Sequence, residues 1–157
     1  MPLPEVTRRS TKPPALKIKF LSHGTLECSD LQATRRFYEE VLGLECIQHA
    51  HTAMLVRLGS EHTYAVVQTP QRHEMPRLFH NGLDVGSEEE VRAAYDKLSE
   101  LKAEYGIRKL YKPQHQHGEY SFFFQDLDGN WWEILVNRPR GYSWKFEDPA
   151  VDLTPKP

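Results

Sequence analysis

The sequence predicts an α+β fold made of two repeated βαβββ modules. The first observation is an internal repeat, because LSHGTLECSDLQATRRFYEEVL aligns without a gap with LFHNGLDVGSEEEVRAAYDKLS at an offset of 57 residues. The second is that each repeated stretch reads as a strand followed by a helix, and each is then followed by three short strand-like runs. A duplicated unit of this kind favours two similar modules that share one core.

The elements follow in the same order in both halves. Helix one is predicted to begin after an N-cap at Ser29, with Gln32 three residues on, and to stop at Gly43. Helix two is predicted to begin after Ser87, with Glu90 in the same relation, and to stop at Gly106. The strand-like runs are 44–50, 53–59 and 63–69 in the first half, and 107–111, 120–126 and 131–136 in the second.

Four segments are therefore expected along the chain. An N-terminal arm, 1–16, precedes the first module, 17–69, and the second module, 70–137, precedes a C-terminal tail, 138–157. The two end segments are rich in proline, which favours extended chain.

Composition and charge exclude several classes of function. The formal net charge of −2 gives no electrostatic footprint for nucleic acid or an acidic membrane surface. No apolar run approaches the length of about 20 residues that a membrane-spanning helix needs, and no signal peptide is evident. Two cysteines, Cys28 and Cys46, do not form a disulfide framework. A cytoplasmic setting is expected.

Three residues are candidate metal ligands. His23 and His80 hold equivalent positions in the two repeats, so pseudo-twofold packing would bring both imidazoles toward one point. Glu133 lies in a strand-like run between large apolar residues, where a carboxylate is costly unless it is paired or bound to a cation. Two histidines and one carboxylate form the set that non-haem Fe(II) oxygenases use. The alternatives are structural histidines, and an ion pair between Glu133 and Arg57 or Arg108.

The repeat, the two histidines and the ending DLDGNWWEIL resemble the vicinal oxygen chelate superfamily. That superfamily includes glyoxalase I, fosfomycin-resistance transferases, bleomycin-resistance proteins and extradiol ring-cleaving dioxygenases, and the resemblance covers about residues 18 to 137. It implies that His23, His80 and Glu133 hold the metal. The fourth ligand of glyoxalase I would fall at Ala65, which cannot ligate, and this counts against glyoxalase chemistry.

The resemblance is closest to small extradiol dioxygenases and implies a site for an aromatic substrate. His115 and His117 are the candidates for a catalytic histidine that accepts or returns a proton, and Phe123 stands where those enzymes carry a tyrosine. Alternation along 113–126 is expected to bring His115, His117, Glu119 and Ser121 to the face of Glu133. The candidate substrate-binding residues are Phe123, Trp131, His51 and Ser121, although Phe123 and Trp131 also fit an ordinary core.

The leading hypothesis is an Fe(II)-dependent, extradiol-type ring-cleaving dioxygenase that acts on a small catecholic substrate with O2. The first alternative is a redox-neutral isomerase, lyase or thiol transferase that uses Mn(II), Ni(II) or Zn(II). The second is a metal-free protein that binds an aromatic drug. A homodimer is expected, and the site is built either within one chain or across two chains that exchange modules.

Overall fold

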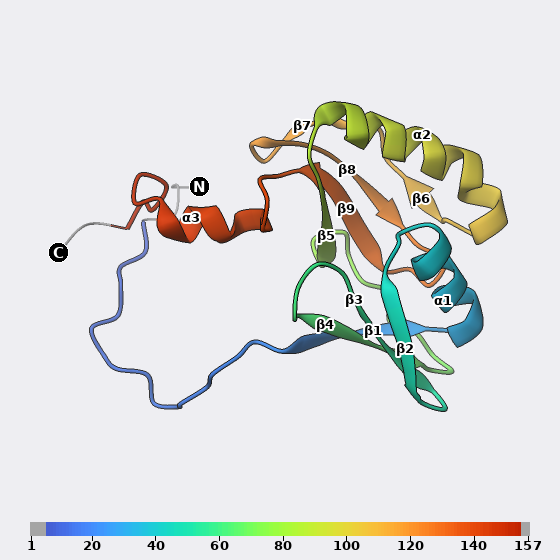
Figure 1. Cartoon of the computed structure of the whole chain (residues 1–157), viewed down its shortest axis with the longest axis horizontal. Helices are drawn as coiled ribbons and strands as arrows, with labels where there is room; N and C mark the ends of the chain where they lie inside the picture. Colours follow the sequence, from blue (N-terminus) through green and yellow to red (C-terminus); the bar gives the residue numbers. More distant parts are fainter. Residues whose placement is uncertain (1–5, 155–157) are drawn as a thin grey trace.

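The computed structural model describes residues 6–154. Its helices and strands (Figure 1) are, in chain order, β1 (His23–Cys28), α1 (Leu31–Glu40), β2 (Glu45–Ala50), β3 (Ala53–Arg57), β4 (Thr63–Gln68), β5 (His80–Val85), α2 (Glu88–Tyr105), β6 (Lys109–Leu110), β7 (Gln114–Gln116), β8 (Glu119–Gln125), β9 (Trp131–Val136), the 3₁₀ turn η1 (Gly141–Ser143) and α3 (Trp144–Glu147).

The two halves have the same sheet topology, which confirms the predicted α+β fold of repeated modules. The first sheet has the order β1-β4-β3-β2, and the second has the order β5-β9-β8-β6, with β7 paired to β8. In both sheets the first strand of the module runs parallel to the last. Even the register repeats, since Thr25 pairs with Ala65 in the first sheet as Gly82 pairs with Glu133 in the second.

The helix boundaries agree with the sequence except at one cap. Ser87 caps α2 by accepting a hydrogen bond from the Glu90 amide, and Gly106 ends the helix in the left-handed conformation with φ of 68°. The N-cap of α1 is Asp30 and not Ser29, because the Asp30 carboxylate accepts from the Ala33 amide. Ser29 instead donates hydrogen bonds from its backbone N–H and its hydroxyl to the Asp128 carboxylate.

The strand predicted at 120–126 is present as β8 (Glu119–Gln125), but the alternation expected to continue back to His115 is broken. The chain forms a hairpin in which β7 pairs with β8 around a turn at His117 and Gly118, whose φ values are 54° and 84°. Gly118 adopts this left-handed region without steric cost, and it supplies the break in the strand. The neighbouring run 107–111 contributes only the two residues of β6.

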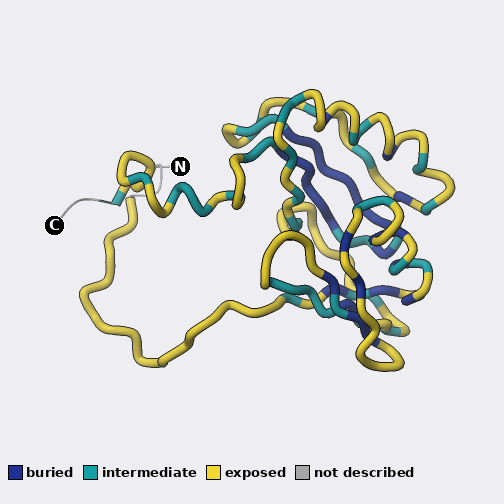
Figure 2. The backbone as a smooth tube through the Cα atoms, in the orientation of Figure 1, coloured by how far each residue is buried: buried dark blue, intermediate teal, exposed yellow. Residues whose placement is uncertain are grey.

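The helix-covered sides of both sheets share a single core (Figure 2). Helix α1 of the first half carries Phe37, whose ring meets Phe124 of the second half edge-on at 6.4 Å. Tyr38 meets Trp132 in the same way at 5.7 Å. The two modules are therefore fixed to each other by aromatic packing.

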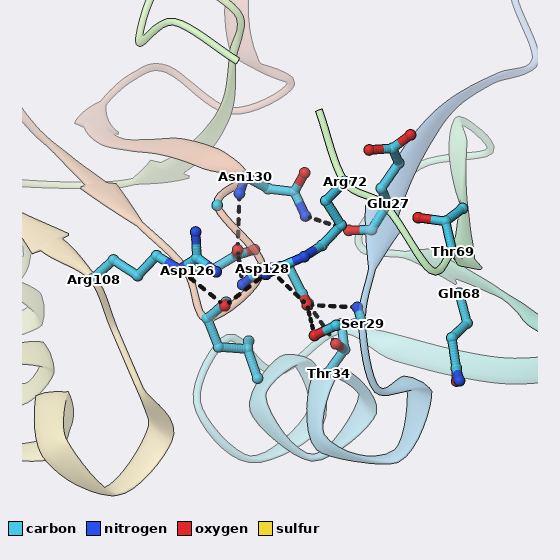
Figure 3. Close-up of polar contacts among 12 residues, drawn as sticks. Glu27, Ser29, Thr34, Gln68, Thr69, Arg72, Arg108, Asp126, Asp128 and Asn130 are labelled. Atoms are coloured by element: carbon cyan, nitrogen blue, oxygen red, sulfur yellow. Dashed lines mark hydrogen bonds and ion pairs between the residues drawn. The ribbon is translucent and has the colours of Figure 1, made fainter. Parts of the chain in front are cut away.

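A buried polar junction closes this contact between the modules (Figure 3). Asp128 of the turn before β9 accepts hydrogen bonds from the Ser29 amide at 2.9 Å and from the Thr34 hydroxyl. Asp126 accepts from the indole N–H of Trp132 at 2.9 Å and from the backbone amides of Asp128 and Asn130. The two aspartates of the D-x-D-G-N sequence thus hold the turn together and bind it to α1.

Most of each terminal segment lies apart from the two sheets (Figure 1), but Gly141 and Tyr142 of the C-terminal segment approach Asp84 of β5. Of the predicted arm, residues 1–5 lie outside the described part, and residues 6–22 form no helix or strand. Of the predicted tail, residues 155–157 lie outside it, and residues 141–147 form η1 and α3 where extended chain was expected. Arg9 forms an ion pair with Asp152, so the two segments meet.

Candidate metal and substrate site

Strands β5 and β9 bring His80 and Glu133 together. His80 pairs with Trp131 and Gly82 pairs with Glu133, so the two side chains are diagonal neighbours on one face of the sheet. His80 Nε2 lies 3.2 Å from Glu133 Oε2. Because Gly82 has no side chain, no side chain of β5 stands directly across from Glu133 in the register.

The hydrogen bonds of the pair determine which atoms face each other. His80 Nδ1 lies 2.8 Å from the Arg77 carbonyl oxygen, which can only accept, so Nδ1 carries the proton. In the neutral imidazole, Nε2 then presents a lone pair to the Glu133 carboxylate. Two acceptors at this distance are favourable only with a cation or a proton between them, and imidazole with carboxylate is a donor set that divalent metals accept.

Glu133 is held by a second chain of hydrogen bonds. Ser121, which is fully buried, donates its hydroxyl to Glu133 Oε1 at 2.6 Å, and the Gln116 amide donates to Ser121 Oγ at 2.9 Å. The alternative of an arginine partner is wrong, since Arg57 pairs with Glu45 and Arg108 lies near Glu74. Oxygen Oε2 is therefore left free to face His80.

His23 does not join this pair within one chain. It is exposed at the start of β1, where its Nδ1 contacts the Ser22 hydroxyl at 2.6 Å. Over residues 6–154 there is no group of three His, Cys, Asp or Glu residues placed to hold a metal ion. The chain brings together two of the three predicted ligands, and the complete set of three stays a prediction.

The predicted substrate residues of the second half share the face of Glu133. Across β9 and β8, Glu133 pairs with Phe123, while Trp131 pairs with Gln125 and Leu135 with Ser121. The Phe123 ring meets the His80 ring edge-on at 4.8 Å. Phe123 and Trp131 are both buried, so they form an apolar floor beside the pair.

Three residues that the sequence did not single out, Tyr111, Arg77 and Lys109, lie on this face. Tyr111 stacks on Trp131 with 6.0 Å between ring centroids and 28° between planes. The Arg77 guanidinium lies over the Tyr111 and Phe123 rings, and the Lys109 ammonium lies over the Trp131 ring. Strand parity places Lys109 beside Gln125, but Arg77 comes from the connection before β5, where no periodic pattern identifies it.

A further tyrosine approaches from the C-terminal segment. The pKa of Tyr142 is raised above its usual value. The largest cause is burial, and the negative charges of three nearby carboxylates add to it, those of Glu119, Glu133 and Asp84. Burial also raises the pKa of Asp84, which stands in the row next to Glu133 on β5. Both groups therefore hold their protons more tightly than the same side chains do in water.

Three of the predicted histidines lie elsewhere. His115 pairs with Tyr120, so it lies on the opposite face from Ser121, and its Nε2 is 3.5 Å from Glu88 of α2. His117 is exposed in the hairpin turn. His51 lines a separate cavity of about 290 Å³ with Asp30, Arg35 and Gln68. The expectation that His115 and His117 share the face of Glu133 is wrong, while their catalytic role stays a prediction.

A larger cavity lies where the two modules meet. Its volume is about 530 Å³, and its walls include Thr25 and Tyr64 from the first module and His80 and Trp131 from the second. The Tyr64 hydroxyl donates to the Asn81 side chain at 2.5 Å across this junction. A small molecule that reaches His80 has room here, since ligand pockets are typically about 300–1,000 Å³.

The repeated modules, the parallel β5–β9 pair and the D-x-D-G-N turn agree with a known family. The sequence profile of the Glyoxalase/Bleomycin resistance protein/Dioxygenase superfamily matches residues 20–134. The chain belongs to this superfamily. No curated protein sequence matches it.

Solved structures of several superfamily proteins share the fold. The genomically encoded fosfomycin resistance protein FosX from Listeria monocytogenes is 21% identical, with a TM-score of 0.62, covering 78% of this chain and 96% of its own. A possible glyoxalase from Bacillus cereus is 24% identical, with a TM-score of 0.61, covering 75% and 99%. Lactoylglutathione lyase from Agrobacterium tumefaciens is 20% identical, with a TM-score of 0.56, covering 80% and 96%.

The superfamily assignment confirms the predicted resemblance to the vicinal oxygen chelate superfamily. The predicted closer relation to extradiol dioxygenases is not shown by these matches. The register places Ala65 at the position equivalent to Glu133, as the repeat predicted.

Cys28 and Cys46 are free and buried. No helix of residues 6–154 is long and apolar enough to cross a membrane.

Proposed function

We propose that this protein is a metal-dependent enzyme that cleaves the ring of a small catecholic substrate in an extradiol-type reaction with Fe(II) and O2. The observation that carries the proposal is the approach of His80 Nε2 to Glu133 Oε2 at 3.2 Å, with the Nδ1 proton already donated to Arg77. A cation between these atoms satisfies both acceptors, and the remaining coordination positions stay open for substrate.

The third ligand in this proposal is His23 of a second copy of the chain. His23 is exposed, and Leu21 and Leu78, which stand just before the first strands of the two modules, are 82% and 80% exposed. Exposed apolar residues of this kind favour a contact with another chain. A homodimer that exchanges modules brings His23 of one copy toward His80 and Glu133 of the other.

The chain's own residues would bind and orient a flat substrate. Phe123, Trp131 and Tyr111 supply aromatic surface beside the ligands. The hydrogen bond from Ser121 to Oε1 fixes the Glu133 carboxylate, so that Oε2 stays directed toward His80. The metal, when bound, supplies chelation of the two substrate oxygens and the activation of O2.

A redox-neutral reaction is the second candidate, with Mn(II), Ni(II) or Zn(II) in the same ligands. The positions of His115 and His117 favour it, since a catechol needs a base near its hydroxyl and neither imidazole lies beside Glu133. An isomerase, lyase or thiol transferase needs the metal to stabilise an oxyanion. Tyr142 and Asp84 are then the candidate acids near the site.

The experiment is metal analysis of anaerobically purified full-length protein, followed by oxygen uptake with a series of catechols. We expect stoichiometric iron in the wild type, its loss in Glu133→Gln, and its retention in Glu100→Gln, which changes an exposed carboxylate on α2. Iron without oxygen uptake, or retention of manganese, nickel or zinc after iron has been offered, would support the redox-neutral candidate. Absence of metal after reconstitution with each ion would overturn both and leave a metal-free binding protein.

A further inference from the structure

We propose that the sheet face beside His80 and Glu133 carries a subsite for an anionic group on an aromatic substrate, formed by Arg77 and Lys109 over a floor of Tyr111, Trp131 and Phe123. This inference deepens the proposed function, because it names a substrate class for the same site: a planar aromatic acid, whose carboxylate is bound away from the metal ligands.

The strand register places these residues in two adjacent rows on one face. One row runs from His80 through Trp131 and Gln125 to Lys109. The next runs from Gly82 through Glu133 to Phe123, and continues to Tyr111, whose amide donates to the Phe123 carbonyl at 3.0 Å. The two metal-ligand candidates are therefore at one side of the face, and Lys109 and Tyr111 are at the other.

Arg77 joins the two sides from the connection before β5. Its guanidinium carbon lies 5.2 Å from the Phe123 ring centroid and 5.0 Å from the Tyr111 centroid. Since the Phe123 ring itself contacts His80, the cation stands one ring away from the ligand pair. The guanidinium covers the Phe123 ring, whereas Tyr111 is 43% exposed, so a benzene ring would enter this face over Tyr111 and turn a substituent toward Arg77.

The charges on this face are unbalanced. Among residues 6–154, neither Arg77 nor Lys109 forms an ion pair with a carboxylate, whereas each arginine within a helix or strand does. Glu133 turns its oxygens to Ser121 and His80 and does not reach these cations. Two cations over aromatic rings, with donors still free, suit a carboxylate, which a guanidinium binds through two parallel hydrogen bonds.

Main chain and side chain of Arg77 have separable roles. The carbonyl accepts the proton of His80 Nδ1, and the side chain alone reaches the rings. Arg77→Met keeps the carbonyl and most of the apolar stem, and it removes only the charge and the five N–H donors. The variant therefore tests the subsite while leaving the orientation of His80 intact.

The test is calorimetric titration of the full-length protein with benzoate and with benzamide, a neutral molecule of the same shape. We expect wild type to bind benzoate more tightly, and Arg77→Met to weaken benzoate binding by about tenfold with benzamide unchanged, which is the size expected for one charge-assisted hydrogen bond. Lys109→Met should weaken benzoate by a smaller factor. Arg92→Met, which removes a cation on α2, is the matched control and should change neither ligand.

The outcomes separate this subsite from the proposed reaction. Titrations are run on metal-free and on metal-loaded protein, so that an Arg77-dependent preference for benzoate supports the subsite even if no ring cleavage is found. Equal binding of benzoate and benzamide would overturn it, because the cations would then only pack on the rings. A preference that is lost in Glu133→Gln and kept in Arg77→Met would also overturn it, since the carboxylate would then be bound by the metal.

Discussion

His80 and Glu133 face each other from adjacent strands although they are not direct register partners. His80 pairs with Trp131 and Glu133 pairs with Gly82, yet Nε2 and Oε2 approach to 3.2 Å. Both side chains are fixed at their other polar atom, His80 by the Arg77 carbonyl and Glu133 by the Ser121 hydroxyl. The pair is thus oriented before any ligand binds, which lowers the entropic cost of binding one.

Replacement of Ser121 by Ala should weaken metal binding. Ser121 is fully buried and donates to Glu133 Oε1 at 2.6 Å, so its loss leaves that oxygen without a partner and frees the carboxylate to rotate. We expect a loss of about 10–100-fold in metal affinity, the usual effect of removing a hydrogen bond that orients a ligand. Equilibrium titration with a competing chelator measures it.

Ser99→Ala is the matched control for this variant. The Ser99 hydroxyl donates to the Tyr95 carbonyl on the exposed side of α2, so metal affinity should be unchanged. Wild-type metal affinity in Ser121→Ala would show that Glu133 needs no such support.

Asp126 should make folding stability depend on pH in an unusual direction. Burial raises the pKa of Asp126 to about 6, against the hydrogen bond from Trp132 that lowers it. In the unfolded chain its pKa returns to about 3.9. Between these two values the folded state holds a proton that the unfolded state has released, so the contribution of Asp126 to the free energy of unfolding falls as pH rises from about 4 to 6, by on the order of 3 kcal/mol.

Urea denaturation of wild type and Asp126→Asn at several pH values between 4 and 7 checks this. The asparagine variant is less stable throughout, since its amide cannot reproduce all the bonds that Asp126 accepts, but it should lack this fall with pH. The exposed Asp96→Asn on α2 should keep the wild-type slope. Parallel pH profiles for wild type and Asp126→Asn would contradict the raised pKa.

The sequence predicts the parts of this molecule that depend on local patterns. The repeat identifies the two modules and the equivalence of Ala65 and Glu133, because strand and helix periods are local and the register follows from them. The predicted face of His115 is wrong, because a turn at Gly118 reverses the chain there and breaks the strand alternation on which the prediction depends. Arg77 is missed because its contacts depend on where an irregular connection lies in space.

The hairpin turn separates the two candidate catalytic histidines. His115 lies on the face toward Glu88 of α2, so His115→Ala should leave turnover close to wild type. If His117 acts as the acid or base, His117→Ala should lower kcat by about 10²–10⁴-fold while metal content is kept. Steady-state kinetics with parallel metal analysis distinguishes the two. Full activity in both variants would leave Tyr142 and Asp84 as the acids to test.

The position of His23 predicts that two inactive variants restore a site when they are combined. In a dimer that exchanges modules, each metal is held by His23 of one copy and by His80 and Glu133 of the other. His23→Ala and Glu133→Gln alone should each lose metal. After both are unfolded together and refolded as a mixture, half of the dimers contain one copy of each, and one of the two sites in such a dimer is intact.

We therefore expect about one quarter of the wild-type metal content in the refolded mixture. Mixing His80→Ala with Glu133→Gln is the control, because both changes fall on the same half of the site. There, every site in a mixed dimer lacks one of these ligands, so no metal should return. Recovery in neither mixture, with wild type regaining metal by the same refolding, would place all the ligands of a site within one chain.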